Sequence, residues 1–194
     1  LALSTMLGGL VKYKAFPDLD GNIIEARILF PQGTPLARTE KFVKKIIYAL
    51  EKVDQKFRKN EKNQEKVVIN TRIVYGFNQD AKETGGHVAT ISVDLLNSEK
   101  RRAKVNEILS SWREKVEVPA DISSLTFSQL TRQPAGKPIE ILVQGENLSH
   151  LKKVSRKLQN WLSQFKGVYD LSDDLRPGKK EIHIRLKEGA SVLG

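Results

Sequence analysis

Few side chains in this sequence have the chemistry of a catalytic group. Asp173 and Asp174 are adjacent carboxylates and Glu181 follows them, so together they could in principle act as general acid and base. Nothing in the sequence supplies a buried partner or a base for them, and adjacent acidic residues near a turn are more often exposed turn formers. We therefore predict that the protein is not an enzyme and has no catalytic residue.

The histidines are poorly spaced for a metal site. His87, His150 and His183 lie far apart, and no pair has a ligand spacing such as His-x-x-x-His. The chain has no cysteine, which excludes disulfides, thiolate metal ligands and thiol nucleophiles. The sequence therefore predicts no metal site and no cofactor.

One run combines basic, glycine and aromatic residues as RNA-binding domains do. The run from Arg72 to Asn78 is similar in type to the segment that places stacking aromatics on a central strand of RNA-recognition domains. Here Gly76 and Phe77 fall where the predicted strand ends, and the second and third aromatics are missing. A basic RNA-binding module is therefore the alternative function.

The charge balance allows an anionic partner but does not require one. The chain has 33 Lys and Arg against 23 Asp and Glu, a net charge of +10. Much of the positive charge lies between Lys41 and Lys62, where acidic residues such as Glu40, Glu51 and Asp54 are interspersed. We interpret this region as a solvated surface of mixed charge.

The strands and helices that position these residues can be predicted from the periodicity of the apolar residues. Alternation predicts strands, and stripes at helical spacing predict helices. The predicted strands are residues 24–30, 67–75, 87–96 and 123–130, and the helical stripes run from Phe42 to Phe57 and from Val105 to Val116. Thr34 can cap the first helix and Pro35 suits its first position, whereas Asn97 or Ser98 can cap the second. This βαββαβ order predicts an α+β, ferredoxin-like split βαβ fold, with two helices on one face of a four-stranded antiparallel sheet.

From Pro134 the same pattern begins again. Ile139, Ile141 and Val143 alternate as in a strand, and an apolar stripe predicts a helix over residues 148–165. A turn at Gly167, a short strand and the alternating residues 182–186 follow. We interpret this segment as a second copy of the unit that is cut short.

The amino-terminal eleven residues are apolar and are followed by Lys12, Tyr13 and Lys14. They are too few to cross a bilayer, which needs about 20 residues. They also lack the basic start and the cleavage site of a signal peptide. Two interpretations remain, a buried element of the domain or the last turns of a membrane helix.

An ordered set of segments resembles one transporter family. The set resembles the start of the second large periplasmic loop of resistance-nodulation-division (RND) efflux transporters, in the same order along essentially the whole chain. Its segments are residues 16–21, 29–39, 83–95, 136–141, 167–170 and 176–190.

The resemblance implies a domain organisation. Residues 1–20 would be the end of a transmembrane helix and a membrane-proximal segment, and residues 21–133 the first porter subdomain. Residues 134–194 would be the first half of a second porter subdomain, ending where a docking domain is inserted. The full-length protein would be a proton-driven homotrimer of the inner membrane, with this fragment in the periplasm. Its partners would be a periplasmic adaptor (membrane fusion) protein, an outer-membrane channel and small-molecule cargo, with no nucleic acid.

The resemblance also suggests a substrate path between the two porter subdomains. The corresponding loop here is Gly76 to Gly86, with Phe77 on it and Tyr75 just before it. An aromatic in a mobile loop flanked by glycines can stack on varied apolar cargo, although Phe77 could equally pack on its own domain. Weaker candidates for the outer mouth of the cleft are Leu125, Phe127 and Gln129.

The cargo is predicted to be organic or amphiphilic. One branch of the family exports copper or silver through clustered methionines in this cleft, and thioether ligands suit such soft ions. This chain has one methionine, Met6, and no cysteine. The loop also lacks the clustered phenylalanines expected of the best-known drug exporters in that family.

Overall fold

The computed structural model describes residues 20–130 and 139–175. Within these ranges no helix is long and apolar enough to cross a membrane. In chain order the elements are β1 (Ile23–Leu29), α2 (Leu36–Arg58), the 3-10 helix η1 (Lys62–Gln64), β2 (Val68–Asn78), β3 (Glu83–Leu95), α3 (Val105–Lys115), β4 (Ser124–Gln129) and α4 (Leu148–Leu162). The predicted elements that fall in residues 1–19, 131–138 and 176–194 lie outside the described residues, and so does the predicted boundary at residue 134.

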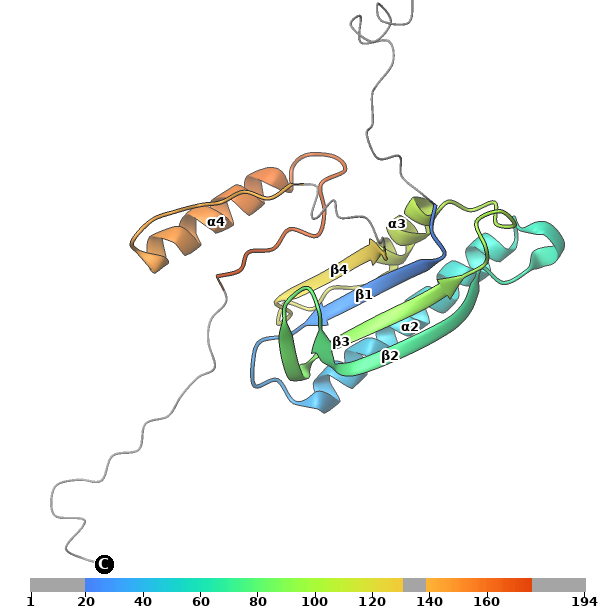
Figure 1. Cartoon of the computed structure of the whole chain (residues 1–194), viewed down its shortest axis with the longest axis horizontal. Helices are drawn as coiled ribbons and strands as arrows, with labels where there is room; N and C mark the ends of the chain where they lie inside the picture. Colours follow the sequence, from blue (N-terminus) through green and yellow to red (C-terminus); the bar gives the residue numbers. More distant parts are fainter. Residues whose placement is uncertain (1–19, 131–138, 176–194) are drawn as a thin grey trace, which may run out of the picture.

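The first seven of these elements form an α+β unit around one sheet. The strands are antiparallel in the order β2-β3-β1-β4, and α2 and α3 lie together on one side of the sheet (Figure 1). The predicted βαββαβ element order and four-stranded antiparallel sheet are confirmed. The two edges of this sheet are therefore β2 and β4.

The core lies between the sheet and the two helices. In β1 the alternating residues Ile24, Ala26 and Ile28 are fully buried, because every second side chain of a strand points to the same face. The α2 stripe supplies the opposite wall. Trp112 of α3 closes the core and donates its indole N–H to the carbonyl oxygen of Ile46 at 3.0 Å, which joins the two helices.

The other face of the sheet is polar. Its side chains follow from the register, because paired residues of neighbouring strands lie on the same face. Most are hydroxyl, amide or charged groups, and none is aromatic. They are Ser124, Thr126 and Ser128 on β4, Ile23, Glu25, Arg27 and Leu29 on β1, Val88, Thr90, Ser92 and Asp94 on β3, and Asn70, Arg72 and Val74 on β2.

The prediction that Asn97 or Ser98 caps the second helix is wrong, because α3 begins only at Val105. The residues before it form an irregular segment around the buried side chain of Arg101. That guanidinium donates to the carbonyl oxygens of Leu96 and Ala103 at 2.9 and 2.7 Å. A helix through this segment would use those carbonyls internally, so the arginine contacts replace the first two turns.

Residues 139–175, the described part of the chain after the sheet, form a helix but no strand. The predicted strand at Ile139, Ile141 and Val143 is wrong, and residues 168–170 are not a strand either. A strand needs a neighbour to accept its backbone hydrogen bonds, and no described strand pairs with these residues. Ile139 and Ile141 are 63% and 50% exposed. The predicted helix is confirmed as α4, although none of its residues is buried.

Candidate functional site

The predicted loop from Gly76 to Gly86 is mostly strand. β2 continues to Asn78 and β3 begins at Glu83, so only residues 79–82 form the turn. Gly76 has a φ of +81° where the β2–β3 register shifts, and Gly85 has a φ of +131°. These positive angles suit glycine, and they make a bulge that bends the hairpin without ending its pairing. Phe77 is therefore held in a paired strand rather than in an open loop.

The tip of the hairpin is folded back over the end of β1 (Figure 1). The side chain of Asn78 is buried and donates to the carbonyl oxygen of Ile28 at 3.2 Å. Asp80 forms an ion pair with Arg27 on the polar face of the sheet. Two contacts thus fix the position of the segment that carries Phe77.

The aromatic candidates on β2 are exposed. Tyr75 is 37% and Phe77 47% exposed, and both belong to an edge strand. The pKa of Tyr75 lies above its ordinary value because of partial burial and then the charge of Glu40. The phenol therefore stays neutral, and Tyr75 exposes part of an apolar ring with one hydroxyl.

Two further apolar side chains of β2 are exposed, and the sequence prediction did not include them. Ile69 and Ile73 are 59% and 39% exposed. Ile73 pairs with Ile91 and Tyr75 with Ala89, so Ile73 and Tyr75 lie on the same face of the edge strand. In the sequence, the spacing of two residues between Ile73 and Tyr75 was the signal that both lie on one face of a strand. Together with Phe77 these four residues form what we call the β2 apolar edge.

The candidates on β4 are placed differently. Phe127 is only 3% exposed and packs edge-to-face on Trp112, with ring centroids 5.0 Å apart. Leu125 is partly buried against the same core, and Gln129 lies against Gly21. The register places all three on the face toward the helices. Phe127 is therefore a core residue with almost no exposed surface.

The structure does not bring the two predicted groups together. β3 and β1 separate β2 from β4. With strands about 4.8 Å apart, the two groups are about 14 Å apart across the sheet. Tyr75, Gly76 and Phe77 are therefore one candidate site, and Leu125 and Gln129 belong to another surface.

A charged cluster occupies the polar face near β1. Glu25 accepts a hydrogen bond from the Ser92 hydroxyl at 2.9 Å and pairs with Arg27 at 2.5 Å. Burial lowers the pKa of Arg27, but the contacts with Asp80 and Glu25 outweigh it and the pKa is raised overall. The guanidinium is therefore permanently charged and cannot act as an acid or base. The cluster joins strand and hairpin rather than providing a reactive group.

The outer edge of β4 is covered by the segment that follows α4. Asp170 accepts the backbone N–H of Phe127 at 3.1 Å, and Arg113 donates to the carbonyl oxygen of Phe127 at 3.0 Å. Arg113 and Asp170 also form an ion pair at 3.0 Å, and the Tyr169 ring lies 3.9 Å from the guanidinium carbon. This cluster attaches the second segment to the first unit.

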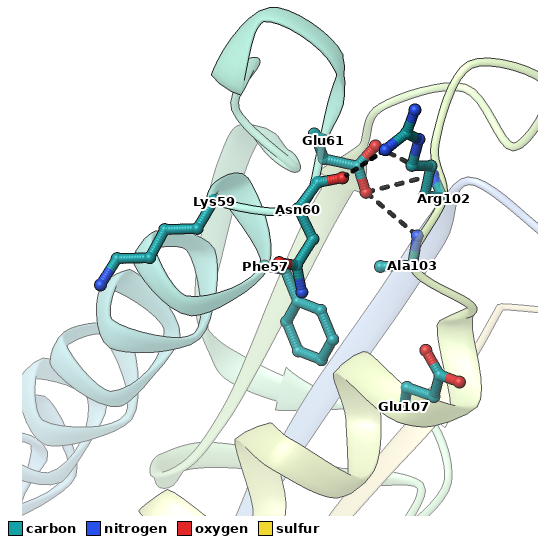
Figure 2. A pocket seen from close by; sticks show the side chains of 7 residues that line it. All are labelled: Phe57, Lys59, Asn60, Glu61, Arg102, Ala103 and Glu107. Carbon is teal, nitrogen blue, oxygen red and sulfur yellow. Dashed lines mark hydrogen bonds between the residues drawn. The ribbon is translucent and has the colours of Figure 1, made fainter.

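An open hollow of about 570 Å³ lies between the end of α2 and the start of α3. Figure 2 shows that the Glu61 carboxylate points toward the backbone of the segment before α3. It accepts the N–H of Arg102 at 2.9 Å and of Ala103 at 3.0 Å. Since these bonds satisfy the carboxylate, it is a structural clasp between two loops and not a ligand site.

The described histidines and carboxylates are not grouped for metal binding. Within residues 20–130 and 139–175 no three histidine or acidic side chains lie close enough to hold an ion. The His87 ring is buried, and its Nε2 lies 2.7 Å from a Glu83 carboxylate oxygen. This contact gives His87 a structural role. Asp173, considered above as a reactive carboxylate, binds Lys152 and Ser155 of α4. His183 and Glu181 lie outside the described residues.

No protein-family model and no curated protein sequence matches this chain.

Proposed function

We propose that this chain is the periplasmic porter portion of a proton-driven RND-type exporter of the inner membrane. In this proposal the unit of residues 21–133 is a ferredoxin-like porter subdomain, and residues 134–194 begin a second one. The complete transporter works as a homotrimer with a periplasmic adaptor and an outer-membrane channel. The chain itself has no catalytic residue and no cofactor.

The observation that carries the proposal is the β2 apolar edge. Four large apolar side chains, two of them aromatic, are exposed along one edge strand of a sheet whose opposite edge is covered. An exposed apolar row of this kind is typical of a contact surface. The ordered sequence resemblance supports the same role, because two members of this row, Phe77 and Tyr75, lie on or just before the loop that corresponds to the substrate path of that family. Cargo would contact these aromatic rings in the cleft between the two subdomains.

Export assays of the full-length protein test this role. We expect Phe77→Ala and Tyr75→Ala to reduce export of apolar or amphiphilic cargo from a cell that lacks its own exporters. Val118→Ala is the matched control, since Val118 is 58% exposed and lies outside the β2 apolar edge. Unchanged export of every tested cargo by both aromatic variants, at normal protein levels, contradicts the assignment.

The cargo in this proposal is an organic molecule and not a soft metal ion. The one methionine, Met6, lies far in sequence from the β2 apolar edge, and the chain has no thiol to bind such an ion. Calorimetric titration with Cu(I) or Ag(I) under anaerobic conditions should give no stoichiometric tight binding. Tight binding would overturn this part of the proposal.

RNA binding by the sheet is the second candidate function, and the polar face argues against it. RNA-recognition domains stack bases on aromatic side chains of that face. None of the fourteen residues assigned above to this face is aromatic. A gel-shift titration with single-stranded RNA separates the two functions, because tight, steeply salt-dependent binding favours the RNA-binding module.

A further inference from the structure

The outer face of α2 carries a continuous row of lysines. At 100° per residue, positions 41, 44, 45, 48, 52, 55 and 59 fall within about 100° of the helix circumference. Apart from Tyr48 and Gln55, all of these positions are lysine. We call Lys41, Lys44, Lys45, Lys52 and Lys59 the lysine stripe. Its members are exposed, and it extends over about 27 Å at 1.5 Å per residue.

The acidic residues of this region do not neutralise the stripe. Asp54 accepts the backbone N–H groups of Val67 and Val68, each at 2.8 Å, and Glu61 is the clasp described above. Glu40 and Glu51 flank the stripe, about 40° and 20° beyond its border on the helix circumference. No described residue forms an ion pair with any of the five ammonium groups of the stripe. The fold therefore separates charges that are mixed in the sequence. Asp54 and Glu61 accept hydrogen bonds from backbone N–H groups, whereas the five lysines are exposed.

We propose that the lysine stripe is a docking surface for a membrane of anionic phospholipids. α2 does not protrude, because Lys56 and the Trp112 indole join it side by side to α3 in one layer. A layer two helices wide is too broad to enter a nucleic-acid groove of about 12 Å, but it can lie on a flat array of phosphates. The successive lysines are separated by no more than about one Debye length, so their fields add at the surface.

The residue types also favour lipid headgroups over nucleic acid. The stripe contains only lysine, a point charge without the planar fork by which arginine binds single phosphates and bases. The one aromatic, Tyr48, has the Lys52 ammonium 4.4 Å from its ring centre, so that ring face is occupied and cannot stack on a base. Tyrosine and lysine together are typical of the membrane–water interface.

Sedimentation with vesicles tests the proposal on the purified chain. One set of vesicles is phosphatidylcholine and the other contains one third phosphatidylglycerol. We expect binding only to the anionic vesicles and weakening by salt. Each lysine near an anionic surface contributes about fivefold to affinity. The triple variant Lys41→Gln, Lys45→Gln, Lys52→Gln should therefore bind about a hundredfold more weakly.

A charge-matched control separates the stripe from net charge. Lys66, Lys100 and Lys115 are exposed and lie outside the stripe, and the variant with all three changed to Gln has the same net charge as the first. It should lose at most a few-fold in affinity, with unchanged circular dichroism for both variants. Equal losses in the two variants, equal binding to neutral vesicles through the apolar residues 1–11, or no vesicle binding would each overturn the proposal. Binding of the stripe to duplex DNA or RNA instead of vesicles would do so too. None of these results depends on export activity.

Discussion

The Arg113 guanidinium and the Asp170 carboxylate form a two-point ion pair, with Nε–Oδ1 and Nη2–Oδ2 distances of 3.3 and 3.0 Å. Each partner also bonds the backbone of the same residue, Phe127. Asp170 has a φ of +57°, a conformation that a short polar residue tolerates better than most. The pair is the main attachment of the second segment to the first unit.

Asp170→Ala should lower the free energy of unfolding by about 1–3 kcal/mol, because it leaves Arg113 and the Phe127 N–H without their acceptor. Urea denaturation measures this change, and hydrogen exchange should show faster exchange at the Phe127 amide. Asp174→Ala is the control, since Asp174 is exposed. Equal effects of the two substitutions would show that the pair contributes nothing to stability.

Trp112→Phe should cost about 2–3 kcal/mol in unfolding free energy. It removes the hydrogen bond to Ile46 and leaves a cavity beside Phe127. Trp161→Phe is the matched substitution at a 54% exposed site and should change stability by no more than about 0.5 kcal/mol. Chemical denaturation followed by circular dichroism compares the two, and a similar loss in both would contradict the assigned core.

Glu61→Gln should destabilise the clasp between the α2–β2 loop and the segment before α3. A neutral amide oxygen accepts more weakly than a carboxylate, and the amide N–H₂ group cannot accept the backbone N–H groups of Arg102 and Ala103. We expect a loss of about 1–3 kcal/mol in denaturant unfolding. The control is Glu65→Gln, which changes an exposed residue directly after η1 and should leave the free energy of unfolding unchanged. No difference between the two variants would reject the clasp.

The attachment of residues 171–175 to α4 should depend on pH. Burial raises the pKa of Asp173, but hydrogen bonds from Lys152, Ser155 and Gln159 and the charge of Lys152 outweigh it and lower the pKa below 3.8. A depressed pKa means that the stabilisation is complete above the unfolded value and is lost as pH falls through the folded one. Carboxyl titration by NMR should give a midpoint below that of the urea-unfolded chain. In Lys152→Met the midpoint should rise, and an unchanged midpoint would remove the lysine as its cause.

The sequence predicted those parts of the fold that depend on local periodicity. Ile24, Ala26 and Ile28 alternate because one face of β1 is buried, and the α2 stripe is regular for the same reason. The extension of β2 through Gly76 was missed, since a glycine within an apolar run is equally typical of a loop and only its φ of +81° identifies a bulge. The start of α3 was missed because the Arg101 side chain binds the nearby carbonyls of Leu96 and Ala103, and no sequence motif indicates such contacts.

The candidate site was predicted in part for a similar reason. The sequence placed Tyr75 at the end of a strand and Phe77 in the loop after it, and it could not show that both belong to an edge strand, which leaves them exposed. The burial of Phe127 could not be predicted from the sequence, because it depends on a contact with Trp112 between β4 and α3. The alternating residues from Ile139 show that a pattern indicates the capacity to pair and not the presence of a neighbouring strand.

The two edge strands of the sheet, β2 and β4, also determine whether molecules associate edge to edge. A bare edge strand is a template on which another chain can add, the first step toward aggregation. On β4, the Phe127 N–H and carbonyl that would receive such a strand are already bonded to Asp170 and Arg113. On β2, register shifts between Val68 and Asn70 and between Tyr75 and Phe77 interrupt the flat ladder that an incoming strand requires. The bulge beside Phe77 thus hinders the addition of another strand while the side chains of the β2 apolar edge stay exposed.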